Sequence, residues 1–138
     1  MAESKRAACV TGLMLAVLML GGCGLTGPAH GPPAQKAATA VTMGFESYSP
    51  ATVTIRSGDT VEWQNTSLIT HTVTDDPKLA KKASDSSLPP SAPAFNSGDI
   101  PAGQVYFHTF MAPGTYRYFC LHHEGDGMLG TVVVRPAS

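Results

Sequence analysis

The stretch Tyr-Arg-Tyr-Phe-Cys-Leu-His-His-Glu-Gly-Asp-Gly-Met, residues 116–128, decides how this sequence is interpreted. It starts as a β-type segment, passes into a glycine-containing turn, and holds a cysteine, two adjacent histidines and a methionine. Cys120 is the only one of the three cysteines that lies beyond residue 23. Exported domains usually pair their cysteines in disulfides, so a lone thiol beside two imidazoles requires another explanation.

The sequence around this stretch has a β-type pattern from Val41 onward. Short segments rich in Val, Thr, Ile, Tyr and Phe are separated by Gly-, Pro- and Asp-containing breakers, and no helical period is evident. These segments are 41–46, 51–56, 59–65, 71–75, 105–110, 115–120 and 129–135. The pattern predicts an all-β sandwich or barrel of about seven to eight strands. The long interval 76–104 interrupts this rhythm, and we expect a brief helix around 77–84 followed by an extended, proline-stiffened loop.

The first 22 residues have the features of an export signal. Lys5 and Arg6 precede an apolar segment, residues 7–20, that is too short to span a bilayer comfortably. The sequence Leu20-Gly21-Gly22-Cys23 is similar to the lipidation motif of bacterial lipoproteins, which makes Cys23 the predicted acylated residue. We therefore divide the chain into a signal peptide (1–22), a flexible Gly-, Pro- and Ala-rich tether (23–40) and one folded domain (41–138). The domain is expected in the bacterial periplasm or on the outer face of the cytoplasmic membrane.

The charge balance is too mild to favour a polyanionic partner. Residues 23–138 contain seven Lys and Arg and nine Asp and Glu, which gives a net charge of −2. Nucleic-acid binding would require a strongly basic surface, so we expect none.

The residue types and their spacing predict a metal site. His123 lies three residues after Cys120, and Met128 five residues after His123, so a loop turning through glycines can bring their side chains together. His71 is the best candidate for a fourth donor. Two imidazoles, a thiolate and a weak axial thioether are the donor set of a mononuclear copper electron-transfer site. A bound metal would also keep the thiol deprotonated, which explains an unpaired exported cysteine.

This part of the sequence resembles the plastocyanin-like cupredoxins over residues 41–135. The resemblance is carried by Trp63-Gln64-Asn65, His71-Thr72-Val73-Thr74, Phe95-Asn96-Ser97-Gly98, Pro101, Gly103, Phe110, Pro113-Gly114-Thr115-Tyr116, Tyr118, Cys120, His123, Met128, Gly130 and Val132. It implies a Greek-key β-sandwich with one type 1 copper, cycling between Cu(I) and Cu(II). It also implies a carrier of single electrons rather than an enzyme, and a monomer. The partners would be c-type cytochromes or copper or haem enzymes.

Two residues depart from the family pattern. His122 stands where plastocyanins usually have proline before the second ligand histidine. Thr72 stands where plant-type plastocyanins have an asparagine that braces the ligand loop, which in this sequence is the loop 121–128, and its hydroxyl would do similar work. The resemblance further implies that His123 is the ligand nearest the surface, within an apolar patch that includes Met43, Leu121 and Leu129. The negative charges of Glu124 and Asp126 on the ligand loop would then influence which partner surface is accepted.

Several alternatives remain open at the level of sequence. His122 competes with His123 as the ligand. Cys120 with a histidine could form a nucleophile and base pair, but that role would leave Met128 and His71 unexplained and has no obvious orienting residue. A zinc site is disfavoured by the thioether, and a thiolate-bridged two-copper centre would need a second cysteine. A copper carrier or supply protein would use the same four residues. A copper-free domain of the same shape, used for interaction, is the remaining reading.

Overall fold

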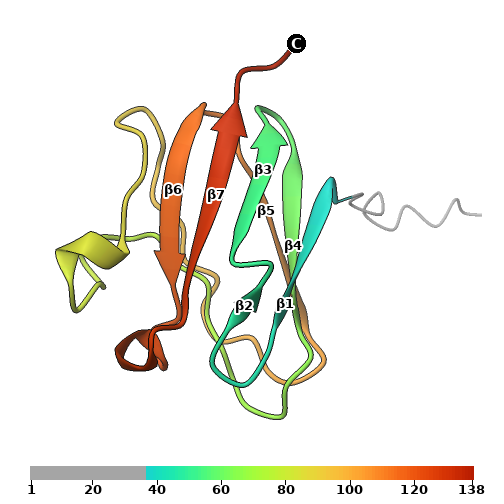
Figure 1. Cartoon of the computed structure of the whole chain (residues 1–138), viewed down its shortest axis with the longest axis vertical. Coiled ribbons are helices and arrows are strands. Elements are labelled where there is room, and N and C mark those ends of the chain that lie inside the picture. Colours follow the sequence, from blue (N-terminus) through green and yellow to red (C-terminus); the bar gives the residue numbers. More distant parts are fainter. Residues whose placement is uncertain (1–36) are drawn as a thin grey trace, which may run out of the picture. The chain divides into compact units, whose positions relative to one another are not determined.

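The computed structural model describes residues 37–138, which form seven strands and two short 3-10 turns (Figure 1). The elements are β1 (Thr39–Met43), β2 (Tyr48–Ser49), β3 (Thr52–Arg56), β4 (Thr60–Asn65), η1 (Ala83–Asp85), β5 (Val105–Thr109), β6 (Gly114–Phe119), η2 (Glu124–Asp126) and β7 (Leu129–Arg135). Within residues 37–138 there is no helix long and apolar enough to cross a membrane. The all-β prediction is confirmed.

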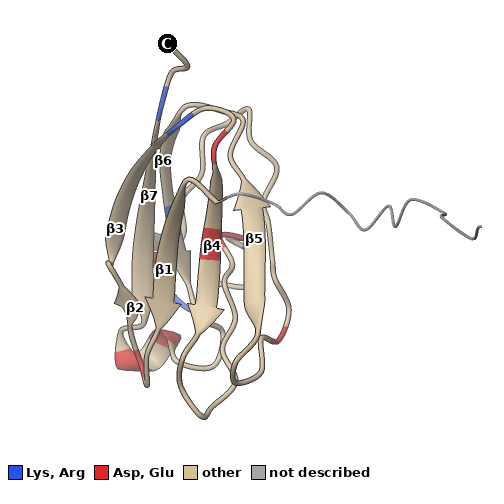
Figure 2. Cartoon of the chain, turned by 90° about the vertical axis from the view of Figure 1, so that its right-hand side faces the viewer, with Lys and Arg blue, Asp and Glu red and all other residues tan. Residues whose placement is uncertain are grey.

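The strands form two sheets that lie against each other; in Figure 2 strands β3, β7 and β6 lie on the left and strands β1, β4 and β5 to their right. One sheet has the order β2-β1-β4-β5 and the other the order β3-β7-β6. Strand β1 runs parallel to β4, and β3 runs parallel to β7, whereas β4–β5 and β6–β7 are antiparallel. Parallel neighbours cannot be joined by a tight hairpin, so the chain crosses between the sheets, which gives the Greek-key sandwich.

The core lies between the sheets, and inward-facing residues alternate with more exposed ones most clearly along β3 and β7. In β3, Val53 and Ile55 are buried while their neighbours are exposed, and β7 buries Val132 and Val134 in the same way. Trp63 is fully buried at the centre of the core, where its ring contacts four other aromatic rings: Phe95, Tyr106, Phe110 and Tyr118.

The interval between β4 and β5 differs from the prediction in two ways. Residues 71–75 form isolated bridges rather than a ladder strand, since Thr74 pairs on one side with Asn96 and on the other with Phe119. The expected helix around 77–84 is wrong: the only helical element between residues 66 and 104 is the three-residue turn η1. At the start of the expected helix, the Lys78 amide donates to the Asp76 side chain. This Asx turn takes the place of helical hydrogen bonds.

The predicted signal peptide, Cys23 and most of the tether lie outside the described residues. Strand β1 begins at Thr39, two residues before the expected start of the domain. Thr39 pairs with Val61 and Ala40 with Glu62, so the last residues of the predicted tether already belong to the sheet.

Candidate metal centre

Cys120 lies at the point where β6 ends and the loop to β7 begins. Its amide donates to the Met128 carbonyl at 3.2 Å, which closes the intervening loop. One residue earlier, Phe119 and Thr74 exchange two backbone hydrogen bonds of 2.9 and 3.1 Å. This bridge ties the segment containing His71 to the end of β6, so residues 49 positions apart meet at one end of the sandwich.

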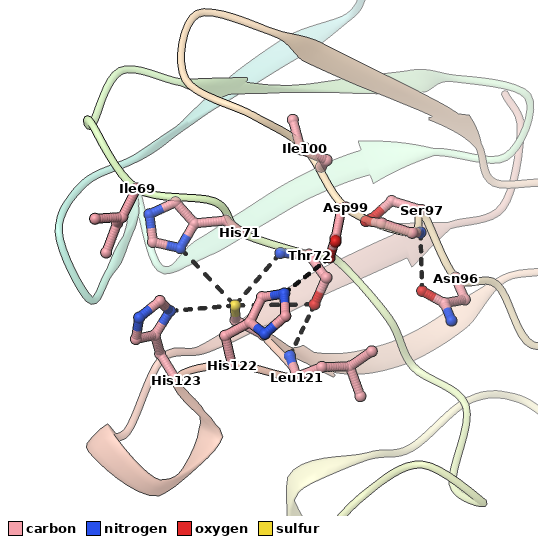
Figure 3. Close-up of polar contacts among 12 residues, drawn as sticks. Ile69, His71, Thr72, Asn96, Ser97, Asp99, Ile100, Leu121, His122 and His123 are labelled. Carbon is pink, nitrogen blue, oxygen red and sulfur yellow. Dashed lines mark hydrogen bonds and ion pairs between the residues drawn. The ribbon is translucent and has the colours of Figure 1, made fainter.

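Three predicted ligands converge on one point. The Cys120 Sγ lies 3.8 Å from Nδ1 of His71 and 3.5 Å from Nδ1 of His123, and both rings turn toward the sulfur (Figure 3). One ligand atom from each of the three residues lies within 4.8 Å of the other two. Cys120 and His71 are fully buried, whereas His123 is half-buried and so lies nearest to solvent. A thiol and two imidazoles in this arrangement fit a copper ion of the type 1 class.

A hydrogen-bonded chain orients the buried imidazole of His71. Its Nε2 lies 2.9 Å from Ser67 Oγ, and this hydroxyl lies 2.8 Å from Oδ1 of Asn65. The fully buried Asn65 is fixed in turn because its side-chain amide donates to the carbonyls of Ile69 and Ile100. The arrangement assigns the proton of His71 to Nε2, which leaves the Nδ1 lone pair directed at the sulfur. Sequence reasoning did not single out Ser67; its spacing of two residues from Asn65 and four from His71 is the only signal.

Burial favours the neutral form of His71. Desolvation lowers the pKa of His71, and the neighbouring imidazole of His123 lowers it further. A neutral imidazole with a free lone pair is the form that binds a metal, so this environment favours the ligand state over the imidazolium.

Thr72 contacts both the sulfur and the ligand loop. Its backbone amide donates to Cys120 Sγ at 3.3 Å, and its hydroxyl accepts a 2.7 Å hydrogen bond from the Leu121 amide. An N–H group directed at the sulfur stabilises negative charge there. The predicted brace by the Thr72 hydroxyl is confirmed.

The loop 121–128 is folded by its own backbone. The His123 carbonyl accepts hydrogen bonds from the Asp126 and Met128 amides, each at 3.1 Å. Gly127 has a φ of 84°, a left-handed conformation that glycine adopts without steric cost. Met128 is fully buried directly after this turn, and its backbone bonds with Cys120 and His123 hold it beside them.

His122 is turned to a different partner. Its Nε2 lies 2.8 Å from an Asp99 carboxylate oxygen, and both side chains are largely exposed. Two surface expectations need correction. Met43 is fully buried and cannot belong to a surface patch, whereas Leu121 and Leu129 are partly exposed and remain available to one. Glu124 is 4% exposed, so its carboxylate is not available at the surface, whereas Asp126 is exposed.

Comparisons with known proteins agree with the assignment of a copper site. Residues 35–135 match the family described as copper binding proteins, plastocyanin/azurin family. Plastocyanin from Prochlorothrix hollandica is 34% identical over 108 residues, covering 74% of this chain and 76% of the relative. Plastocyanin from a Synechococcus strain is 33% identical over 134 residues, covering 88% and 90%. Among solved structures, amicyanin from Paracoccus versutus superposes with a TM-score of 0.55 at 29% identity, covering 75% of this chain and 84% of that chain.

The Greek-key sandwich, the convergent thiol and imidazoles, and these relatives agree. Plastocyanin-like cupredoxins are electron carriers that work outside the cytoplasm. The chain belongs to the plastocyanin/azurin family of copper-binding proteins, and it is a type 1 copper electron-transfer protein.

Proposed function

We propose that His71, Cys120, His123 and Met128 hold the single copper ion. The observation that carries this assignment is the approach of one sulfur and two imidazole nitrogens to within 4.8 Å of one another at a buried position. Met128 would be the fourth, weakly bound ligand, because it is fully buried and bonded through its backbone to both Cys120 and His123. Bound copper would supply a one-electron couple.

The protein's own contribution is to fix the positions of these metal-binding groups and to exclude water from them. The Ser67 hydroxyl fixes the ring of His71 by a hydrogen bond, and the Thr72 amide donates a hydrogen bond to the Cys120 sulfur. Burial of Cys120, His71 and Met128 excludes water from the sulfur side of the centre. Donor groups that are fixed before an electron arrives need little rearrangement when it does, which favours fast transfer.

We infer that electrons enter and leave through the imidazole of His123. It is the one ligand of the four that is not buried, so a partner can approach it closely. Two strongly exposed apolar side chains, Phe45 at 68% and Leu68 at 95%, lie in the β1–β2 turn and in the loop that leads to His71. We propose that they form the docking rim in place of Met43. A small apolar contact of this kind permits fast release.

We propose that the domain is exported and anchored by lipid on Cys23, with residues up to about 38 as a tether. Its partners would be c-type cytochromes or copper or haem enzymes at the same membrane. Because Cys120 and both imidazoles are committed to the metal, we infer that the chain has no enzymatic activity. Mass spectrometry of the protein expressed in a bacterium should find acyl chains on Cys23, and an unmodified N-terminus would contradict the anchor.

The experiment that tests the transfer function is rapid mixing of the copper-loaded protein with a c-type cytochrome. We expect complete and reversible exchange of one electron per protein, with copper retained after many cycles. A copper carrier would instead release Cu(I) to a chelator after reduction and would exchange electrons slowly. Loss of copper on reduction would therefore contradict an electron-transfer role.

A further inference from the structure

The carboxylate of Glu124 is buried on the ligand loop and binds backbone outside it. Its Oε1 accepts hydrogen bonds from the amides of Lys81 and Lys82 at 2.8 and 3.1 Å, and its Oε2 lies 3.0 Å from the Lys81 amide. The two lysine side chains themselves are exposed, so the contact uses only their backbone. Hydrogen bonds from amides to a buried carboxylate are among the stronger ones in proteins.

The amides that bind Glu124 are themselves held to β6. The segment 75–87 leaves β6 at the Thr74–Phe119 bridge and returns to it at a second bridge, where Ser87 and Arg117 exchange backbone hydrogen bonds of 2.8 and 3.2 Å. Between these bridges the Ser86 hydroxyl donates to the Asp75 carbonyl. The segment is therefore a loop fixed at both ends to the strand that carries Cys120 at its end.

Glu124 lies in the turn at the centre of the loop 121–128. It directly follows His123, and its own carbonyl accepts a 3.0 Å hydrogen bond from the Gly127 amide. The preceding carbonyl, that of His123, accepts from the amide of Met128. A displacement of Glu124 would thus move the backbone of both His123 and Met128.

We propose that Glu124 is a positioning residue for the copper centre: it clamps the ligand loop to the segment 75–87 and so holds His123 and Met128 at a fixed place relative to Cys120. The clamp connects β6, the segment 75–87 and the ligand loop in a closed ring. This gives the long interval between β4 and β5 a role in the centre. The inference rests on the proposed ligand assignment.

The variants that test it are Glu124→Gln and Asp126→Asn, which remove the same charge from neighbouring positions of one turn. Asp126 is exposed and makes no side-chain hydrogen bond among the described residues, so it is the matched control. A third variant, Lys81→Ala with Lys82→Ala, removes both lysine charges but keeps the two amides. These changes leave the four proposed ligands in place.

The first readout needs no copper. Amide hydrogen exchange of Lys81 and Lys82 in the metal-free protein should become at least about tenfold faster in Glu124→Gln, because a charge-assisted bond is lost, and should not change in Asp126→Asn. Unchanged exchange in Glu124→Gln would overturn the clamp itself, whether or not the protein binds copper.

The second readout is electron self-exchange of the copper-loaded protein, followed by nuclear magnetic resonance, together with the electron paramagnetic resonance spectrum of Cu(II). Removing one negative charge from an acidic protein weakens repulsion between two copies, so charge alone should speed self-exchange slightly in both acidic variants. A loosened ligand loop should instead slow it about five- to tenfold in Glu124→Gln only, with an altered Cu(II) spectrum. The double lysine variant should keep the wild-type spectrum.

Two further results would overturn the proposal. In one, Glu124→Gln loses amide protection but keeps the wild-type spectrum and self-exchange rate, so the contact only secures the segment 75–87. In the other, both acidic variants change equally, so charge is responsible. If Glu124→Gln does not fold, Glu124→Asp keeps the charge but shortens its reach, and the same readouts apply. Failure of the wild-type protein to bind copper would instead contradict the proposed function and leave the amide-exchange result standing.

Discussion

At the scale of single residues, one hydroxyl group determines how the buried imidazole faces the sulfur. Ser67 bridges His71 and Asn65 at 2.9 and 2.8 Å. Replacing it by alanine leaves Nε2 of a buried ring without its partner, so the ring can rotate or change tautomer. We expect Ser67→Ala to weaken copper binding by about 10- to 100-fold, measured by competition with a chelator.

The matched control is Ser67→Thr, which keeps the hydroxyl and should keep most of the affinity. Equal loss in both variants would mean that packing, and not the hydrogen bond, is responsible. Equal affinity in wild type and Ser67→Ala would contradict the orienting role of Ser67.

A second prediction concerns Asp75, which is fully buried away from the proposed ligands. Its Oδ1 accepts a 2.8 Å hydrogen bond from the Phe95 amide, whereas Oδ2 has no hydrogen-bond partner. Burial raises the pKa of Asp75 to about 6, against 3.8 for an ordinary aspartate, although the Phe95 amide lowers it in part. The folded state therefore holds this proton more tightly than the unfolded chain does.

The sign of the pH dependence follows directly. The contribution of Asp75 to stability is complete at a pH below the unfolded value and is lost as the pH rises through about 6. Asp75→Asn is uncharged at every pH, so we expect it to be more stable than wild type by about 1–2 kcal/mol at pH 8, with the advantage gone near pH 4. Denaturant unfolding of the metal-free proteins at both pH values measures this. A difference that does not change with pH would contradict the prediction.

At the scale of elements, the packing of β6 on β7 depends on one glycine. Gly130 is the partner of Tyr118 in the register of these strands, and a Cβ at Gly130 would collide with the Tyr118 ring. The buried tyrosine has no space to move because it packs against Trp63 and Tyr48. We expect Gly130→Ala to lower the free energy of unfolding by about 1–3 kcal/mol. Gly125→Ala is the control, since nothing lies within 4 Å of its Cβ position, and it should change stability little.

Features that depend on local sequence patterns could be predicted, whereas features that depend on contacts between distant segments could not. Alternation in β3 and β7, and the spacing of Cys120, His123 and Met128 in one loop, are local signals that report directly on structure. The burial of Met43 is not local: it depends on the parallel register that pairs it with Asn65 in β4. The same holds for Glu124, whose partners lie 42 and 43 residues away.

The structure of the segment 71–75 also depends on partners that are distant in the sequence. Its β-type residues predicted a strand. They do form β-bridges, but the partners are isolated positions in loops and at a strand end: Ile100, Asn96 and Phe119. Lysines and alanines between 78 and 83 favour a helix by propensity, yet the backbone there is bound by Glu124 and by the bridges to β6. Tertiary hydrogen bonds outweigh a weak local preference.

At the scale of the whole molecule, the two ends of the sandwich should differ in function. Leu68 lies in the loop leading to His71, whereas Met111 lies between β5 and β6, at the end of β6 remote from Cys120. Both are exposed, at 95% and 68%. We expect Leu68→Glu to slow electron exchange with a c-type cytochrome about tenfold by placing charge in an apolar contact. Met111→Glu should have little effect, and equal slowing would contradict docking at the copper end.

The central claim, that Cys120, His71 and His123 bind one copper, is tested most directly by titrating the purified protein with Cu(II) and recording its visible absorption. We predict an intense blue band that saturates at one copper per chain and is absent from Cys120→Ala and His71→Ala. A protein that stays colourless, or a band that survives in Cys120→Ala, would contradict the account.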